Sequence, residues 1–554
     1  MATHEVINQP PPLVDYDVFG QDRALVEAVH REGADWAAGD LHELGRLAGS
    51  ADAIEWGFQA NACTPVLRTH DRFGFRIDQV DYHPAYHRLM GVAVEHGLHA
   101  APWADRREGA HVARAAAFSV WSQVEAGHGC PISMTYSVIP ALRAQPDLAA
   151  DWEPGLVSRR YDPHVVPAAT KAGVLAGMAL TEKQGGSDVR ANTTRAEPLG
   201  AARGPSAEYR ITGHKWFCSA PMSDVFLALA QAPGGLSCFL VPRWTPDGER
   251  NAIRLQRLKD KLGNRSNASS EIEFEHAWAR MIGEEGRGIP TIIEMVDHTR
   301  LDCVIGSSSG MRQAVAQATH HAAHRRAFGA SLSDQPLMLN VLADLAVESE
   351  AATLSALRLA GAYDRAAGDE HEALFRRLAT PVVKYWVCKR QPTHVGEALE
   401  CLGGNGYVEE SILPRLYREA PVNGVWEGSG NVIVLDVLRA MARAPRTVDA
   451  FFDEVDMAAG ADVALDTSAV ALRKDVEDIR TTGGAAGIEG GARRLVERMA
   501  LVLQGALLVR HGHPAVADAF CASRLGGDWG VTLGTLPSGV DARTIIDRAR
   551  PDAA

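Results

Sequence analysis

The feature that most constrains the fold is a block of strand pattern between two long helical regions. Between residues 178 and 285, polar and apolar residues alternate in short runs, for example at 208–212 and 271–275, which is the period of a half-buried strand. Pro233-Gly234-Gly235 separates two apolar runs and predicts a hairpin. We therefore expect one antiparallel sheet domain. Because strands and helices do not alternate, a dinucleotide site of the Rossmann type is disfavoured.

Helical spacing dominates on both sides of this block. Met338, Val341, Leu342 and Leu345 stand at i, i+3, i+4 and i+7, which places them on one face of a helix. The same spacing continues to about residue 443 and returns near the end of the chain, after a glycine-rich stretch at 481–491. The expected fold class is α+β. The four expected parts are an N-terminal helical domain with an extended arm at 1–177, a middle antiparallel β domain at 178–288, a helical bundle at 289–443 and an additional C-terminal helical domain at 444–554.

The sequence pattern of residues 1–177 predicts helices joined by long loops. Proline-rich residues 9–12 predict an extended arm, because proline lacks the amide hydrogen that a helix needs. Residues 85–99 and 110–125 have helical patterns. Six prolines between residues 131 and 167 then predict a loop-rich region.

Composition and charge exclude several classes of protein. The 554 residues are 46% hydrophobic and 23% charged, as in globular proteins. A net charge of −13 argues against a surface that binds polyanions everywhere, although a local basic patch stays open. No apolar run is long enough to span a membrane. The eight cysteines form no Cys-x-x-Cys pair and no signal peptide is visible, so we expect a cytoplasmic protein.

Two histidine clusters are spaced like metal ligands. His83 and His87 are four residues apart, and His320, His321 and His324 share one helical turn. Neither cluster has a further carboxylate at metal-binding spacing. We therefore expect no metal and interpret both as packed or exposed histidines.

The strongest local motif covers residues 180–189. Adjacent Gly185 and Gly186 would let the backbone approach a ligand closely. Thr181 and Ser187 supply hydroxyls, and the amides between them could form an anion-binding nest. On this pattern alone, an ordinary polar turn is the simpler interpretation.

Two further motifs follow. Residues 214–219 place aromatic rings beside Ser219, which could cover a flat ring and bond its edge, although a sheet core explains them equally. Glu427 lies in a loop before a helix expected from about Val432, which Ser429 or Asn431 could cap. A partly buried carboxylate there could act as a general base, although most glutamates at helix starts only complement the helix dipole.

In order and spacing, these three motifs together resemble the acyl-CoA dehydrogenase superfamily. Its members hold FAD between a middle β domain and a C-terminal helical bundle. Within it, the chain resembles the AidB family, flavoproteins of the bacterial response to DNA alkylation. The motifs that carry this second resemblance, besides the helical extension beyond residue 443, are at residues 8–10, 181–188, 257–261, 264–269 and 426–431.

The resemblance implies a site for FAD. The residues it places against FAD within one subunit are Leu180, Thr181, Gly185, Gly186, Ser187, Phe217, Ser219, Trp426, Gly428, Ser429 and Asn431. Other residues would reach the FAD of a neighbouring subunit, which implies a homotetramer. These are Arg325, Phe328, Gln335, Gly403 and Gly404.

The resemblance also implies a reaction. Glu427 matches the base that removes the α-proton of an acyl-CoA while a hydride leaves the β-carbon for the flavin. Ser187, Thr299 and Arg300 match positions near the acyl-CoA. Nitroalkane-oxidising relatives carry aspartate in place of Glu427, so that branch is disfavoured.

The AidB resemblance implies binding of double-stranded DNA in the alkylation-damage response, with weak dehydrogenase activity of the isovaleryl-CoA type. The alternative is a catabolic acyl-CoA dehydrogenase without a DNA role. Residues 439–554 hold 14 basic and 16 acidic residues, so DNA binding would need arginines gathered on one face. Arg439, Arg443 and Arg446 have the spacing of one helix side and are the candidate DNA contacts.

Overall fold

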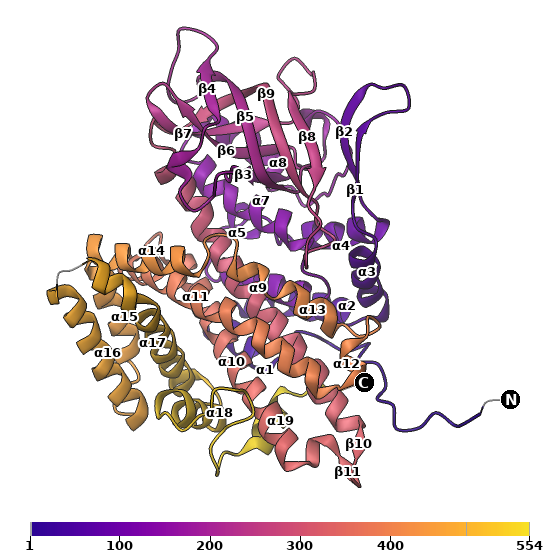
Figure 1. Ribbon diagram of the computed structural model, residues 1–554, viewed down its shortest axis with the longest axis vertical. Helices are drawn as coiled ribbons and strands as arrows, with labels where there is room; N and C mark the ends of the chain where they lie inside the picture. The colour runs from indigo at the N-terminus through magenta and orange to yellow at the C-terminus, as the bar shows by residue number, and fades with distance from the viewer. Residues whose placement is uncertain (1–2, 483–484, 553–554) are drawn as a thin grey trace. The chain divides into compact units, whose positions relative to one another are not determined.

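The computed structural model describes residues 3–482 and 485–552, so residues 483–484 of the glycine-rich stretch lie outside it (Figure 1). Contacts divide the chain into two compact units. The helical unit comprises Met1–Ile54, Glu108–Val124 and Cys303–Ala554, and the sheet unit comprises Glu55–Arg107 and Glu125–Asp302. The order of helices, sheet and helices confirms the α+β class. The three boundaries between the four domains expected from the sequence stay predictions.

A seven-stranded sheet forms the core of the sheet unit. Strands β6 and β7 make the predicted hairpin, paired from Val225↔Pro242 to Ala232↔Gly235. The sheet is not wholly antiparallel as predicted, because β6 pairs in parallel with β3 and β4. The strands run in the order β3-β6-β4-β5-β9-β7, with β8 on β9. They are β3 (Ala176–Ala179), β4 (Arg195–Pro198), β5 (Glu208–Ser219), β6 (Val225–Ala232), β7 (Gly235–Pro242), β8 (Ile253–Leu258) and β9 (Ser269–Ile282).

Two predictions for the first 177 residues are wrong. The pattern analysis missed an antiparallel hairpin of β1 (Val66–His70) and β2 (Arg76–Asp81), which stands beside β8 (Figure 1). The proline-rich region is also not a run of loops, because Pro131 and Pro140 lie within α7 (Gly129–Leu142). A helical proline costs about 3 kcal/mol, and the nearly complete burial of α7 offsets that cost. The other helices here are α3 (Ala51–Ala62), α4 (Pro84–Glu95), α5 (Ala101–Ala104) and α8 (Pro146–Leu156).

Long helices build the helical unit. The predicted helix face around Leu342 and Leu345 lies on α10 (Pro336–Arg365), where both leucines are fully buried. Helix α9 (Gly288–His324) begins in the sheet unit and ends in the helical unit. The remaining elements are α1 (Arg23–Arg31), α2 (Ala38–Ala48), α6 (Ala110–Ser122), β10 (Arg326–Ala327), β11 (Ala330–Ser331), α11 (Glu370–Cys401), α12 (Gly404–Tyr407), α13 (Leu413–Glu419), α14 (Gly430–Arg443), α15 (Arg446–Asp456), α16 (Val463–Thr482), α17 (Ala485–His511), α18 (Pro514–Phe520) and α19 (Ala542–Ala549).

Buried ion pairs fasten the last helices to α10 and α11. Arg358 of α10 binds Glu372 of α11 at 2.9 Å and Glu454 of α15 at 2.7 Å, and Arg510 of α17 reaches Glu454 at 2.7 Å. Removing one partner of such a pair would leave an uncompensated buried charge. The C-terminal extension is therefore part of the helical unit. None of the described helices is long and apolar enough to cross a membrane.

Candidate functional site

The loop that follows β3 in the sheet unit is built around a buried ion pair. Lys215 of β5 contacts the Glu182 carboxylate at 2.9 Å, and both side chains are fully buried. Glu182 also accepts hydrogen bonds from the amides of Thr193 at 2.7 Å and Thr194 at 3.1 Å. Lys215 donates a further bond to the Leu229 carbonyl at 2.7 Å. Every charge is therefore matched, as burial requires.

This pair fixes the charge state of the loop. Burial by itself would raise the pKa of Glu182, but Lys215 and the amides outweigh burial and lower it to about 2. The motif interpretation of the sequence missed both residues. The sequence did contain a signal for Lys215. It follows Tyr209 and Ile211 at an even spacing on β5, so it shares their buried face of the strand.

The loop backbone is tight and needs its glycines. Glu182 and Gly185 exchange two backbone hydrogen bonds of 3.0 and 3.3 Å, and Gly185 has φ +148°. A Cβ on Gly186 would lie 2.4 Å from the Thr181 hydroxyl oxygen. The Trp216 amide donates to the Thr181 carbonyl at 2.8 Å, which ties the loop to β5. Because Gly185 and Ser187 are exposed, this backbone is open to a ligand.

An uncovered ring and a hydroxyl lie further along β5. The Phe217 side chain is 49% exposed, although large apolar rings are usually buried. The Ser219 hydroxyl is 3.1 Å from that of Ser269, to which Lys261 donates at 3.0 Å. A flat apolar surface, a hydroxyl group and a tight glycine loop are what the isoalloxazine ring and phosphates of FAD require. These residues therefore fit FAD.

In the helical unit, Glu427 occupies a strained turn. Its φ is +57°, which is rare for a residue other than glycine, and Gly428 follows with φ +105°. Buried Lys384 donates to the carbonyls on both sides of Glu427, to Trp426 at 3.0 Å and to Gly428 at 2.6 Å. The Trp426 indole donates to Asn423 at 2.8 Å. Strain that is held by several bonds is typical of functional positions.

Helix α14 begins two residues earlier than predicted, at Gly430, so Asn431 lies inside its first turn. Ser429 occupies the N-cap position, although its side chain makes no capping bond. A Cβ on Gly430 would meet the Lys389 side chain at 2.8 Å. Burial, together with nearby Arg493 and Lys384, lowers the pKa of Lys389. The turn therefore lies in a positive field that the sequence motifs did not indicate.

Among the residues expected at a neighbouring subunit's FAD, Arg325 contacts the N-terminal arm. Arg325 donates to the Asn8 carbonyl at 2.5 Å, and the Asn8 side chain bonds the backbone of Arg326 at 2.8 and 2.9 Å. Gln335 bonds the Ala327 carbonyl at 3.0 Å. Phe328 is 99% exposed with φ +51°. Arg325 is thus held by its own chain, whereas the Phe328 ring projects into solvent.

Two of the residues expected near the acyl-CoA and the three expected to contact DNA lie on helices. Thr299 and Arg300 are buried on α9, where Arg300 pairs with Asp297 at 3.2 Å. The prediction that Arg439, Arg443 and Arg446 lie on one side of a single helix is wrong, because α14 ends at Arg443 and Arg446 starts α15 after Pro445. Their role as DNA contacts stays a prediction.

Partners also separate these arginines. Arg439 contacts Asp436 at 3.4 Å and Arg446 contacts Glu370 at 2.6 Å. Arg443 is exposed in the last turn of α14. Its guanidinium is therefore the most available of the three.

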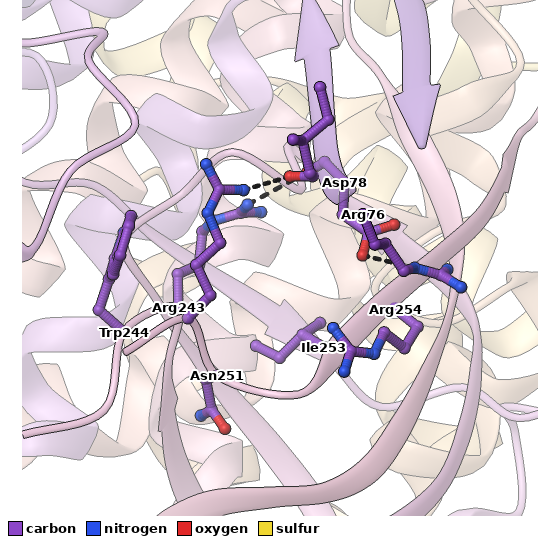
Figure 2. A pocket seen from close by; sticks show the side chains of 9 residues that line it. Arg76, Asp78, Arg243, Trp244, Asn251, Ile253 and Arg254 are labelled. Atoms are coloured by element: carbon purple, nitrogen blue, oxygen red, sulfur yellow. Dashed lines mark hydrogen bonds and ion pairs between the residues drawn. The ribbon is translucent and has the colours of Figure 1, made fainter. Parts of the chain in front are cut away.

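A small cleft lies where the β1–β2 hairpin meets the sheet (Figure 2). Arg76 contacts Asp78 at 2.8 Å, and Arg243 donates to the Asp78 carbonyl at 3.2 Å. Burial lowers the pKa of Arg243 to about 10. The cleft has a volume of only about 20 Å³, which is room for about one water. The contacts of its lining residues hold the hairpin on the sheet, and the cleft is too small for a ligand.

The histidine clusters have other partners. His87 lies 2.8 Å from the Tyr161 hydroxyl, and His320 lies 2.9 Å from the Pro11 carbonyl. Among the residues that the structure describes, no three His, Cys, Asp or Glu side chains are grouped to hold a metal ion.

Comparison with known proteins identifies the family. Family models match the AidB N-terminal domain at residues 8–163, the acyl-CoA dehydrogenase middle domain at 177–277 and the acyl-CoA dehydrogenase C-terminal domain at 286–442. The chain is 47% identical to AidB of Escherichia coli (strain K12), over 96% of each chain. This chain belongs to the AidB family of acyl-CoA dehydrogenases. Acyl-CoA dehydrogenases are FAD-dependent oxidoreductases, so this chain is an oxidoreductase with FAD as its cofactor.

Other relatives agree with this placement. Acyl-CoA dehydrogenase family member 11 of Caenorhabditis elegans is 30% identical, over 86% of this chain and 80% of its own. The crystal structure of Caenorhabditis elegans ACDH-11 in complex with C11-CoA matches with a TM-score of 0.85 at 27% identity, covering 95% of this chain and 94% of that one. A Bacillus anthracis acyl-CoA dehydrogenase complexed with FAD shares the fold, with a TM-score of 0.64 at 18% identity, covering 97% of this chain and 88% of that one.

We expect Lys215→Met to release FAD and to lower the thermal unfolding temperature. The variant leaves Glu182 buried without a cation, a change that costs about 3–5 kcal/mol. In the wild type, the lowered pKa of Glu182 adds stability that is complete above the carboxyl group's ordinary pKa near 4.5 and is lost as the pH falls toward 2. Unfolding temperature and flavin absorbance, measured from pH 3 to 8, test this.

Lys474→Met is the matched control, because Lys474 pairs with Asp478 on an exposed helix face. Such pairs contribute at most about 1 kcal/mol. Equal losses in the two variants, or an unaltered acid transition in Lys215→Met, would contradict a structural role of the buried pair.

Proposed function

We propose that this AidB-family protein binds double-stranded DNA in the response to alkylation damage and retains weak acyl-CoA dehydrogenase activity of the isovaleryl-CoA type. The strained Glu427 turn, clamped by Lys384, carries the dehydrogenase part. Exposed cations along α14 and α17 support the DNA part. A cytoplasmic location belongs to the same proposal, since all eight cysteines are free and only Cys63 is exposed.

In this proposal the loop at 181–187 and the ring of Phe217 hold FAD, with Ser219 beside it. The cofactor supplies a hydride acceptor that no side chain can replace. The task of the chain is to orient it. The Glu182–Lys215 pair does so by giving the loop a single conformation, and the exposed face of Phe217 offers a flat contact.

Glu427 is the proposed base for the α-proton of the acyl-CoA. Lys384 bonds the two flanking carbonyls, so the backbone at Glu427 cannot relax from its positive φ. A fixed backbone limits the positions that the carboxylate can reach. A base works only when it is held within hydrogen-bonding distance of the proton that it removes.

Glu427→Gln is expected to retain FAD while losing isovaleryl-CoA dehydrogenation by about 10²–10⁴-fold, the usual contribution of a general base. The amide keeps the size of the side chain and cannot accept the proton. Dye-coupled turnover and the flavin spectrum, measured on one preparation, separate catalysis from cofactor loss. Glu410→Gln, at an exposed glutamate of the helical unit, serves as the control. Wild-type turnover in Glu427→Gln would show that another group takes the proton.

A homotetramer is also part of the proposal. Exposed apolar side chains gather near the arm of the helical unit: Phe328 is 99%, Leu337 87% and Tyr407 80% exposed. The arm links their segments, since Asn8 bonds Arg326 and Gln9 lies 3.5 Å from Asn405. Apolar surface of this kind is stabilised by burial against another copy of the chain.

We expect Phe328→Asp to shift the tetramer toward smaller species and to lower FAD content in proportion. A charge replaces the ring that would be buried against a neighbour, and burial of such a ring is worth about 1.5–3 kcal/mol. Light scattering combined with flavin absorbance reads both effects. Val531→Asp alters an equally exposed residue and should change neither. A Phe328→Asp tetramer with full FAD would exclude this face from the interface.

The DNA proposal rests on a small set of cations. Arg443 is exposed at the end of α14, and Arg439 is half-exposed with a long contact of 3.4 Å to Asp436. At the other end of α14, Lys389 lies beside Gly430 and Arg493 of α17 bonds the Tyr385 hydroxyl at 3.2 Å. Figure 1 shows α14 lying against α17 in the helical unit. Arg446 contributes less, because Glu370 holds it at 2.6 Å.

Binding through phosphates should be nearly independent of sequence and should weaken steeply with salt, by about 0.9 logarithmic units per phosphate neutralised. Arg439→Ala combined with Arg443→Ala is expected to weaken all duplexes alike and to flatten this slope by about one to two units. Fluorescence anisotropy from 20 to 300 mM salt measures it. Arg203→Ala, at an exposed arginine of the sheet unit, is the matched control.

The alternative function is catabolic dehydrogenation without a DNA role. Isovaleryl-CoA turnover measured beside DNA binding distinguishes the two. If the wild type binds no duplex even at 20 mM salt, the catabolic function replaces the DNA proposal. A double variant that keeps the wild-type slope would instead move the DNA contacts to other residues.

A further inference from the structure

A cavity of about 390 Å³, partly open to solvent, is lined by residues of the sheet unit. Ligand pockets start at about 300 Å³. Four segments line the cavity: the end of β2 with α4, the start of α7, the segment 161–175 and the turn 220–224 after β5. Its size is therefore that of a small-molecule site.

Aromatic side chains form one wall. Tyr82 and Tyr86 are stacked with ring centres 4.4 Å apart, and the His87 ring meets both edge-on. His87 is in turn 2.8 Å from the Tyr161 hydroxyl. Burial raises the pKa of all three tyrosines and lowers that of His87. At neutral pH this wall therefore presents uncharged rings and hydroxyl donors.

The charged groups around the cavity are already matched. Lys171 contacts Asp224 at 2.8 Å, and the Leu175 amide donates to the same carboxylate at 2.9 Å. Asp162 accepts from His164 and Ala172, at 3.0 and 3.2 Å. The third acid of the lining, Asp81, pairs with Arg68 at 2.6 Å. An incoming charge would have to break one of these bonds or remain unpaired.

The cavity lining also includes uncharged hydroxyl groups that could bond a ligand. The Ser223 hydroxyl is buried without a partner among the residues that the structure describes. Tyr82 and Tyr86 also line the cavity, and Tyr86 is only 4% exposed. An unmatched buried hydroxyl costs about 1–3 kcal/mol. A ligand that offered a polar group here would remove that cost.

The turn that carries Ser223 is itself strained. Ala220 has φ +47°, and Ser223 donates its amide to the Ala220 carbonyl at 2.8 Å. A residue other than glycine keeps such a conformation only when its surroundings enforce it. The strain holds Ser223 at the cavity in one position.

We propose that this cavity is a binding site for an uncharged aromatic molecule that carries a hydrogen-bonding group. The aromatic wall supplies apolar contact, the hydroxyls of Ser223, Tyr82 and Tyr86 supply polar contact, and the acids, which already have partners, disfavour anions. The lining contains neither the proposed base nor a proposed DNA contact, and the proposal does not depend on either function.

The test uses N-phenyl-1-naphthylamine, an uncharged fluorescent aromatic amine, titrated into FAD-loaded wild-type protein. Saturable fluorescence is expected. Val165 lines the cavity from a surface segment and is only half-buried, so Val165→Trp should fill the space without disturbing the core. That variant should weaken probe binding by about tenfold or more, since it removes most of the apolar contact. Val166→Trp, one residue along and outside the lining, should bind as wild type does.

Displacement then defines the ligand class. Benzamide should displace the probe, whereas benzoate, of the same shape and negatively charged, should not. Ser223→Ala should weaken benzamide by about threefold to tenfold, the effect of one hydrogen bond, while unfolding temperature and FAD content stay at wild-type values. Unchanged probe affinity in Val165→Trp, no saturable binding in wild type, or displacement by isovaleryl-CoA but not by benzamide would each overturn the proposal.

Discussion

The Glu182–Lys215 ion pair is the contact on which the arrangement of the sheet unit depends. Two charges excluded from water are tolerated only when every hydrogen-bonding direction is filled. Amides and a carbonyl from two separate segments fill them here, at Thr193, Thr194 and Leu229. The glycine loop therefore cannot shift without exposing a buried charge. The loop and β5 are joined further by the bond from the Trp216 amide to the Thr181 carbonyl, so the geometry proposed for FAD depends on the same pair.

Lysine has a corresponding use in the helical unit. The chain has only eight lysines, and Lys384 is one of those that are fully buried. Its ammonium group joins two carbonyls that flank Glu427. A tetrahedral ammonium can reach carbonyls in diverging directions, whereas the planar guanidinium of arginine suits flat carboxylates. The same division holds elsewhere, since Arg358 is bound by the carboxylates of Glu372 and Glu454.

Ion pairing also limits what the C-terminal extension can offer to a polyanion. Arg524 is fully buried between Asp344 and Glu348, and Arg548 is buried with Glu350. Arginines of this kind hold the extension onto α10 and cannot reach a phosphate. Counting basic residues in the sequence therefore overstates the charge available to DNA. Arg443 of α14 and Arg493 of α17 are among the basic residues that stay exposed.

Local patterns in the sequence determined much of the outcome. Alternation predicted the sheet and the hairpin at 233–235, and helical spacing predicted α10, because these periods follow directly from backbone geometry. Motif spacing indicated the family, since a shared cofactor constrains residues in a shared order. The roles of the individual site residues stay predictions.

Tertiary structure decided the rest, through burial and long-range pairing. Pro140 stays helical because α7 is buried, the β1–β2 hairpin forms beside β8, and Pro445 ends α14 before Arg446. None of these follows from local spacing. Nor could spacing reveal that Lys215 and Lys384 find their partners far along the chain. A buried charge is stabilised by whichever groups the fold brings around it, and only the three-dimensional structure contains that information.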